Sequence, residues 1–366
     1  MQAFTFQTSV GKLANQLRCK ALNGIGMQDG KPKPTLIDVA KLAGVSTATV
    51  SRCLNAPDKV AQDTRDRVKA AVDQLGYAPN FGAQAMATRR TKTIAAVIPT
   101  MENAIFAKGL QAFQEELRGH GYTMLVASSS YDPAIEAEQI RTLISRGADG
   151  FLLIGHDRDP ALYQLLAQQN VPALVAWTFA KEQPLCSVGF DNRAAMRTLA
   201  EQILSFGHKK LAFVGSPTTA NDRSRERLKG VQDAISGIGT ADVALTIIET
   251  PYGIEEGAAA FAKLMSNANP PTAIICGNDV LAVGALKEAR RTGFSVPHDV
   301  SITGFDGLEL ALMAEPPLTT VAVPHQEMGR IAARALVRMA TGETTPNSVE
   351  LQTKVQMGGT LGPAPL

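Results

Sequence analysis

The chain alternates short apolar runs with longer amphipathic stretches from Thr93 onward, and this alternation restricts the folds that it can adopt. Runs such as Phe151–Ile154 and Ala273–Cys276 offer no polar side chain to either face of a strand. Such strands lie inside parallel sheets that helices cover on both sides. We therefore predict an α/β architecture with parallel sheets. The predicted strands are Ile94–Ile98, Thr123–Ala127, Phe151–Ile154, Ala173–Ala176, Leu211–Val214, Val243–Ile248, Ala273–Cys276, Ser301–Gly304 and Thr320–Val323.

A weak internal repeat divides this region into two similar lobes. Ile94–Ile98 precedes a Gly-Leu-Gln-Ala-Phe segment at 109–113, and Leu211–Gly215 precedes a Gly-Val-Gln-Asp-Ala segment at 230–234. Two α/β lobes leave a cleft between them, and ligands of such sheets bind beyond the carboxyl ends of the strands. The repeat therefore predicts a two-lobed ligand-binding body.

The charge of the chain is unevenly distributed. Residues 31–92 hold eleven Lys or Arg against five Asp, a net charge of +6, and residues 1–30 add +2. Because the whole chain carries +2, residues 93–366 carry −6. A small basic segment joined to a large acidic body predicts a polyanion-binding head, and a solvated surface is the alternative.

Two short helices with a tight turn between them are predicted inside the basic segment. Thr35 is a good N-cap, with Asp38 three residues later near the positive end of the helix dipole. Gly44 stands where a helix ends in the left-handed conformation, and Ser46 then caps a second helix. This helix-turn-helix is able to place its second helix in a DNA major groove. The alternative is an ordinary helical hairpin with a surface arginine.

The second helix of this pair has small polar residues on its outer face, so it can approach base edges closely. Val50, Cys53 and Leu54 form its inner face. Arg52 suits a bidentate pair with guanine. The outer residues are Thr47, Ala48, Thr49, Ser51 and Arg52.

The order of these motifs resembles that of the lactose-repressor (LacI/GalR) family of bacterial transcription regulators. The resemblance runs from about Thr35 to the C-terminus, and it implies the periplasmic-binding-protein fold for the body. The matching residues are Asp38-Val-Ala-x-x-Ala-Gly-Val-Ser46, Thr49-Val-Ser-Arg52, Asn55, Gly76-Tyr77-x-Pro79-Asn80 and Ala83-x-x-Met86.

For DNA, the resemblance implies that Thr47, Ala48 and Arg52 read bases, and that Asn55 and Asn80 position the head. Segment 81–92 would be a hinge helix in the minor groove, with a methionine where the family inserts a leucine wedge. The expected DNA-binding residues are Thr47, Ala48, Thr49, Ser51, Arg52, Asn55, Asn80, Ala83 and Met86.

For the effector, the resemblance implies contacts from Arg227, in an Arg-x-x-Gly motif, and from Asp306, which accepts hydrogen bonds from ligand hydroxyls. An arginine fork grips a carboxylate or vicinal hydroxyls. Structural alternatives are a solvated charge for Arg227, a turn residue for Asp306 and a helix cap for Asn278. Asp191-Asn192 is interpreted as a cap and hinge, and Trp177 as a core residue. The expected effector-binding residues are Arg227, Asn278, Asp306, His156 and Phe106.

These features predict four segments along the chain. They are a disordered N-terminal extension at 1–33, a helix-turn-helix head at 34–80, a hinge helix or linker at 81–92, and an effector-binding and dimerisation domain at 93–366. Lobe 1 is expected at about 93–190 plus 323–345, and lobe 2 at about 191–322. Family members start close to the helix-turn-helix, so we expect translation to begin at Met27.

Other classes of protein are disfavoured by what the sequence does not contain. There is no phosphate loop, no nucleophile elbow and no metal-ligand spacing among the histidines, so we expect no enzyme, metal or cofactor. Four widely spaced cysteines suit a reducing compartment. No apolar run approaches the roughly 18 residues of a membrane helix, and no secretory apolar region is present. A cytoplasmic protein without membrane contact is expected.

The sequence therefore predicts a sequence-specific repressor of a carbohydrate or sugar-acid utilisation operon. Its expected partners are a palindromic double-stranded DNA operator, a sugar, sugar acid or polyol effector, and a second copy of the chain in a homodimer. One alternative is a solute-binding protein for sugar transport, which shares the two lobes but needs export. Another is a nonspecific nucleoid protein, which explains only the basic head.

Overall fold

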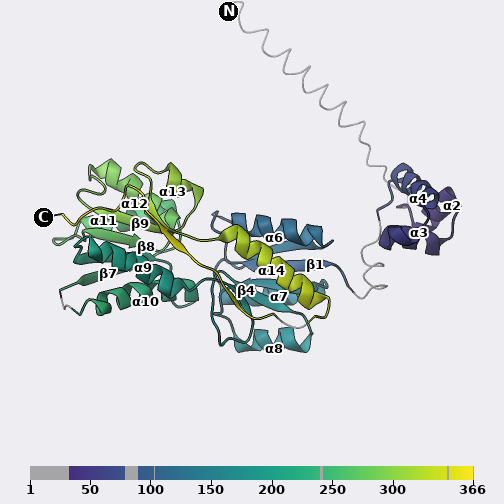
Figure 1. Cartoon of the computed structure of the whole chain (residues 1–366), viewed down its shortest axis with the longest axis horizontal. Coiled ribbons are helices and arrows are strands. Elements are labelled where there is room, and N and C mark those ends of the chain that lie inside the picture. Colours follow the sequence, from purple (N-terminus) through teal and green to yellow (C-terminus); the bar gives the residue numbers. More distant parts are fainter. Residues whose placement is uncertain (1–32, 79–89, 103, 240–241, 344–345, 366) are drawn as a thin grey trace, which may run out of the picture. The chain divides into compact units, whose positions relative to one another are not determined.

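The computed structural model describes residues 33–78, 90–102, 104–239, 242–343 and 346–365, and the chain divides into two compact units (Figure 1). The first unit, called the head, ends at Ala87, and the second, called the body, begins at Thr88. The predicted N-terminal extension lies outside the described residues except for Lys33, as does the predicted hinge helix except for 90–92, which are not helical.

The head is a small helical unit around one apolar core. Its elements are α2 (Leu36–Ala43), α3 (Thr47–Asn55), a 3-10 turn (Pro57–Lys59) and α4 (Gln62–Leu75). The buried core residues are Val39, Ala40, Ala43, Val50, Val68, Ala71 and Tyr77.

The caps of the head follow the sequence signals. Thr35 and Asp38 form a reciprocal capping box at the start of α2, and Gly44 ends that helix with φ 66°. Ser46 accepts a hydrogen bond from the Thr49 N–H at 3.1 Å and so starts α3. These caps fix the turn that separates α2 from α3, so the predicted helix-turn-helix is confirmed.

The body contains two six-stranded sheets, one in each lobe. The first sheet has the order β11-β5-β4-β3-β1-β2 and the second the order β12-β10-β9-β8-β6-β7. The first-sheet strands are β1 (Thr93–Ile98), β2 (Thr123–Ser128), β3 (Gly150–Ile154), β4 (Ala173–Ala176), β5 (Ser187–Gly189) and β11 (Val349–Glu350). The second-sheet strands are β6 (Lys210–Gly215), β7 (Ala244–Glu249), β8 (Ala273–Cys276), β9 (Ser301–Asp306), β10 (Thr319–Ala322) and β12 (Lys354–Gln356).

Helices cover both faces of each sheet, and this explains why the central strands are apolar throughout. Along β1, Ile94 and Ala96 pack toward α6 and α14, whereas Ala95 and Val97 pack toward α7 and α8. The second sheet is likewise enclosed, by α9 and α10 on one face and α11 and α12 on the other. The helices are α6 (Ala107–Gly119), α7 (Pro133–Ser145), α8 (Pro160–Gln168), α9 (Asn192–Ser205), α10 (Asp222–Gly237), α11 (Ile254–Met265), α12 (Asp279–Thr292), α13 (Glu309–Met313) and α14 (His325–Ala340).

The chain passes between the lobes three times: after β5, after β10, and between β11 and β12. The third crossing was not predicted, because β5, β11 and β12 are only two or three residues long and give no apolar signal. β12 also pairs antiparallel with β10, a departure from the predicted parallel sheets. Val243 and Val323, expected in strands, lie just outside β7 and β10.

All nine predicted strands are present, with ends that differ by at most two residues. Within the described ranges, no helix is long and apolar enough to cross a membrane.

Two glycines allow α6 and α14 to cross in direct contact. A Cβ at Gly329 would overlap the carbonyl oxygen of Gly109 and come within 3.0 Å of the Phe113 nitrogen. Both obstacles are backbone atoms, which have no rotamer to change. The close approach keeps α14, which follows the second crossing, packed on the first lobe.

We expect Gly329→Ala to lower the free energy of unfolding of the body by about 1–3 kcal/mol through overpacking. The matched control is Gly237→Ala, also in a helix, where a Cβ would meet nothing within 4 Å. The free energy of unfolding of that variant should be unchanged or higher by up to about 1 kcal/mol. Urea unfolding of both proteins measures the difference, and equal midpoints would contradict the close-contact argument.

Candidate functional sites

The outer face of α3 presents small polar groups and one cation. Thr47, Ala48 and Arg52 are exposed, whereas Thr49 and Ser51 are half-buried. The Thr49 hydroxyl lies 2.9 Å from the Ser46 hydroxyl. This face can therefore approach a nucleic-acid surface closely, with Arg52 as its charged group.

Asn55 extends this face by one helical turn. Its side-chain amide donates a hydrogen bond to the Ser51 hydroxyl at 3.3 Å. Three further residues that were expected to contact DNA, Asn80, Ala83 and Met86, lie outside the described residues.

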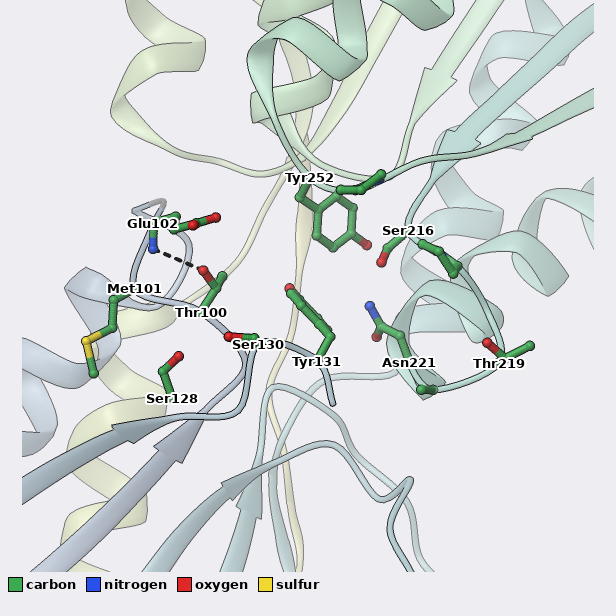
Figure 2. A pocket seen from close by; sticks show the side chains of 13 residues that line it. Thr100, Met101, Glu102, Ser128, Ser130, Tyr131, Ser216, Thr219, Asn221 and Tyr252 are labelled. Atoms are coloured by element: carbon green, nitrogen blue, oxygen red, sulfur yellow. Dashed lines mark hydrogen bonds between the residues drawn. The ribbon is translucent and has the colours of Figure 1, made fainter. Parts of the chain in front are cut away.

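A cavity with a volume of about 530 Å³ lies between the two lobes of the body. Figure 2 shows that side chains from both lobes line it. The first lobe contributes the loops after β1 and β2, and the second lobe the loops after β6 and β7. The lining residues are Thr100, Met101, Glu102, Ser128, Ser130, Tyr131, Ser216, Pro217, Thr219, Ala220, Asn221, Pro251 and Tyr252.

Seven of the thirteen lining residues carry a hydroxyl group. They are Thr100, Ser128, Ser130, Tyr131, Ser216, Thr219 and Tyr252. Asn221 adds an amide, and its oxygen caps α10 by accepting a hydrogen bond from the Ser224 N–H. A wall with many groups that both donate and accept hydrogen bonds suits a polar ligand of small-molecule size.

None of the five residues expected to bind effector lines this cavity. Arg227 is buried, and its guanidinium is held by the protein itself. Nε donates to the Asn192 Oδ1 at 2.8 Å, Nη1 to the Gly277 carbonyl at 2.5 Å, and Nη2 to the Asp306 Oδ1 at 3.4 Å. The guanidinium also lies 3.7 Å from the ring centroid of Phe305. The solvated-charge reading of Arg227 is therefore wrong, and its main contacts are structural.

Asp306 is the buried partner of Arg227, at the end of β9. Burial raises the pKa of Asp306 to about 6, against the opposing effect of Arg227. Its Oδ2 is buried and has no hydrogen-bond partner in the described part of the chain. Its carbonyl oxygen accepts a hydrogen bond from the His325 Nε2 at 2.9 Å. The pair therefore leaves one carboxylate oxygen able to accept a hydrogen bond.

Asp279 fixes the turn that follows Asp306. Its carboxyl accepts hydrogen bonds from the Leu308 N–H at 2.7 Å and the Thr320 hydroxyl at 2.5 Å. Burial, with the nearby Asp306 carboxylate, raises the pKa of Asp279 to about 8. Asp279 thus holds a proton near neutral pH, and no sequence signal had indicated this role.

Asn278 and Phe106 have structural contacts. The Asn278 oxygen caps α12 through the Leu281 N–H at 2.9 Å, so the cap reading is confirmed, while its Nδ2 is buried without a partner among the described residues. Phe106 packs edge-on against Trp177, with ring centroids 5.2 Å apart. Trp177 is a buried core residue, as expected.

Asp191 matches its interpretation as a cap, and Asn192 lies beside it at the first crossing. Asp191 caps α9 by accepting hydrogen bonds from the N–H groups of Arg193 and Ala194. The Asn192 amide donates to the Trp177 carbonyl at 3.0 Å while its oxygen holds Arg227. The first crossing is therefore bonded to both lobes.

His156 lies apart from this cluster, at a polar contact between the lobes. Its backbone N–H donates to the Asp222 carboxylate at 2.7 Å, and its neighbour Asp157 forms a two-point ion pair with Arg225 at 2.6 and 2.7 Å. Burial lowers the pKa of the His156 imidazole, so the ring stays neutral. His156 lines a second cavity of about 360 Å³.

The sequence reasoning missed the residues of the larger cavity, Tyr131 and Tyr252 above all. A signal was present, since the lining loops follow predicted strands, where ligands of parallel sheets bind. The residues of the family pattern lie deeper in the second lobe or on other loops.

Comparison with known proteins places the chain among transcription regulators. The model described as "Bacterial regulatory proteins, lacI family" matches residues 35–80, and the periplasmic binding protein-like domain model matches residues 200–361. The HTH-type transcriptional repressor CytR of Escherichia coli (strain K12) is 35% identical over 310 residues, which cover 84% of this chain and 90% of that protein.

Two solved structures extend the comparison. The transcriptional regulator CelR in complex with cellobiose has a TM-score of 0.64 at 30% identity, over 89% of this chain and 99% of that one. The lac repressor dimer bound to operator and the anti-inducer ONPF has a TM-score of 0.79 over 91% and 100% of the two chains. Its identity is 24%, so this likeness concerns the fold alone.

We expect Asp279→Asn to alter how stability depends on pH. Between about pH 3.8 and pH 8 the folded protein keeps the Asp279 proton and the unfolded chain has lost it, so stability falls as pH rises through this window. Each pH unit costs up to about 1.4 kcal/mol. The variant lacks this titrating group, so its free energy of unfolding should rise relative to that of the wild type between pH 5 and pH 8. The exposed Asp242→Asn is the control, and parallel curves for Asp279→Asn and wild type would contradict the buried proton.

Proposed function

Since this chain belongs to the lacI family of bacterial regulatory proteins, and so is a DNA-binding transcription regulator, we propose that it represses genes for the use of a carbohydrate or sugar acid. A small-molecule effector between the lobes of the body sets its affinity for the operator. The observation that carries the proposal is the joint presence of a capped helix-turn-helix and an interlobe cavity lined by hydroxyl groups.

The DNA contact is assigned to α3, with Thr47, Ala48 and Arg52 at the bases. Support comes from their exposure and from the small size of the first two, which lets the helix enter a major groove. Thr49, Ser51 and Asn55 are assigned to the same contact. The family pattern adds three more residues to the proposed DNA contact, namely Asn80, Ala83 and Met86.

The effector is assigned to the 530 Å³ cavity, with the Arg227–Asp306 pair and Asn278 behind it. Support comes from the lining of the cavity by both lobes, since a ligand there contacts two bodies at once. The relative CelR was solved with a disaccharide, cellobiose. His156 and Phe106 lie at the lobe contact and in the core, so their effect on ligand binding is indirect.

A homodimer is proposed, because each head meets one half-site of a palindrome. Support comes from apolar side chains exposed on the edge strands β2 and β7 and on α13, since unprotected edges and apolar patches favour association. These residues are Leu125, Val126, Ile247, Leu312 and Met313. The lac repressor was solved as a dimer on its operator.

Regulation follows from the two-lobed geometry. The lobes are joined by three crossings and by polar contacts such as the partly exposed ion pair Asp157–Arg225. A ligand that contacts both lobes favours one relative arrangement over another. It changes operator affinity only through its different affinity for the two arrangements.

We expect Arg52→Ala to relax base preference at one position of each operator half-site, by about 1–3 kcal/mol for a bidentate contact. An operator selected from random DNA, and its single-base variants, would be titrated with the full-length protein. Lys69→Ala, an exposed cation on α4, is the control and should leave base preference unchanged. If Arg52→Ala weakens binding equally to all sequences, Arg52 contacts only phosphate.

The same titration, repeated with cellobiose, gluconate, sorbitol and related compounds, tests effector control. One compound class should change operator affinity by about 5- to 150-fold, the usual range of coupling between sites. Specific operator binding that no compound changes would contradict effector control. Salt-dependent binding to every DNA sequence would instead indicate a nonspecific nucleoid protein.

A further inference from the structure

The interlobe cavity has an uneven charge. Among the thirteen described residues that line it, Glu102 carries the one ionised group, and the other polar groups are hydroxyls and an amide. No lysine, arginine or histidine is among these thirteen described residues. A ligand in the cavity therefore meets hydrogen-bond partners and one negative charge.

The arginines near the cavity are already paired with carboxylates. Arg223 bonds to Asp222 at 2.7 Å, Arg225 to Asp157 at 2.6 Å, and Arg227 to Asp306 at 3.4 Å. A ligand carboxylate or phosphate would have to displace one of these partners, and the displaced acid would lose its counter-charge. Displacement from Arg227 would leave Asp306, which is completely buried, as an unpaired charge.

The buried groups next to the cavity include the cations of Arg223 and Arg227, and each of these is paired with a carboxylate. Burial, with the nearby Tyr252 and Asp306, raises the pKa of the Tyr131 phenol, so the phenol remains a neutral donor and acceptor. Asp306 also retains an unpartnered Oδ2. Groups on the ligand that donate hydrogen bonds, such as hydroxyls, suit this environment, and acidic groups do not.

Two tyrosine rings face each other from opposite lobes. Tyr131 follows β2 in the first lobe and Tyr252 follows β7 in the second, and their ring centroids lie 6.2 Å apart at an interplanar angle of 66° (Figure 2). This edge-to-face contact joins the two lobes across the cavity. If the lobes move apart, a ring of the ligand can take the place of this contact, with one tyrosine packed on each of its faces.

We propose that the effector is an uncharged, hydroxyl-rich molecule whose ring offers an apolar face, and that Tyr131 and Tyr252 hold the ring while Glu102 and the paired arginines exclude acids. This inference rests on the effector site of the proposed function and narrows its ligand class. Neutral saccharides and nucleosides share this chemistry. Sugar acids and sugar phosphates do not.

The test compares matched pairs that differ in one acidic group, with full-length protein and thermal unfolding as the readout. The saccharide pair is cellobiose and cellobionate, and the nucleoside pair is adenosine and adenosine 5′-monophosphate. One neutral compound should raise Tm and bind at least tenfold more tightly than its acid. The pair that responds identifies the ring as a sugar or a base.

Variants at the proposed contacts sharpen the test. Tyr252→Ala should weaken binding of the neutral compound at least tenfold. Tyr252→Phe keeps the ring, so its affinity for that compound should stay within about threefold of the wild-type affinity. Glu102→Gln should improve binding of the acid and leave the affinity for the neutral compound unchanged. The control is Glu182→Gln, because Glu182 is an exposed acid outside the lining. This variant should bind both compounds as the wild type does.

Two results would overturn the inference. Tighter binding of an acid than of its neutral partner would refute the exclusion of acids, while the effector site itself would stand. No response to either neutral compound would refute the assigned class. Failure of the proposed function is a separate result, because it would appear as the absence of sequence-specific operator binding by the same protein.

Discussion

The buried ion pair between Arg227 and Asp306 is the interaction on which the arrangement of the two lobes depends. Both side chains are almost without solvent contact, so each charge must be balanced inside the protein. Arg227 is bonded to the first crossing through Asn192, and the Asp306 carbonyl holds His325 at the second crossing. One ion pair in the second lobe thereby anchors both crossings, and a shift of either crossing disturbs a buried charge.

This anchoring carries a conformational cost that neighbouring residues offset. Asp306 has φ 108°, a region that L residues rarely adopt and that costs roughly 1–3 kcal/mol. The turn after it is held by Asp279, which accepts hydrogen bonds from Leu308 and Thr320. A protonated, buried carboxyl thus fixes the conformation of an ionised one. This explains why two acids lie close together in the interior of a lobe.

The sequence predicts those parts of the fold that local pattern determines. Strands such as β3 and β8 are apolar on both faces because helices cover both faces, and the caps at Thr35 and Ser46 are local hydrogen bonds. β11 and β12 are held by pairing with distant strands, and short polar segments give no signal of such pairing. The same limit applies to the site. Arg227 was found by motif, but its partners lie 35 to 79 residues away in sequence, and only the fold brings them together.

Helix α10 connects the hydroxyl-lined cavity with the buried ion pair of Arg227 and Asp306. Helix α10 begins at the cavity, where Asn221 caps it, and carries Arg223, Arg225 and Arg227 within its first two turns. A ligand that contacts the start of this helix acts on the same rigid element that holds the ion pair. Because interiors are densely packed, the helix moves as a unit rather than deforming locally. Under the proposed function, a ligand in the cavity therefore acts on Asn192 and on the crossings through this helix.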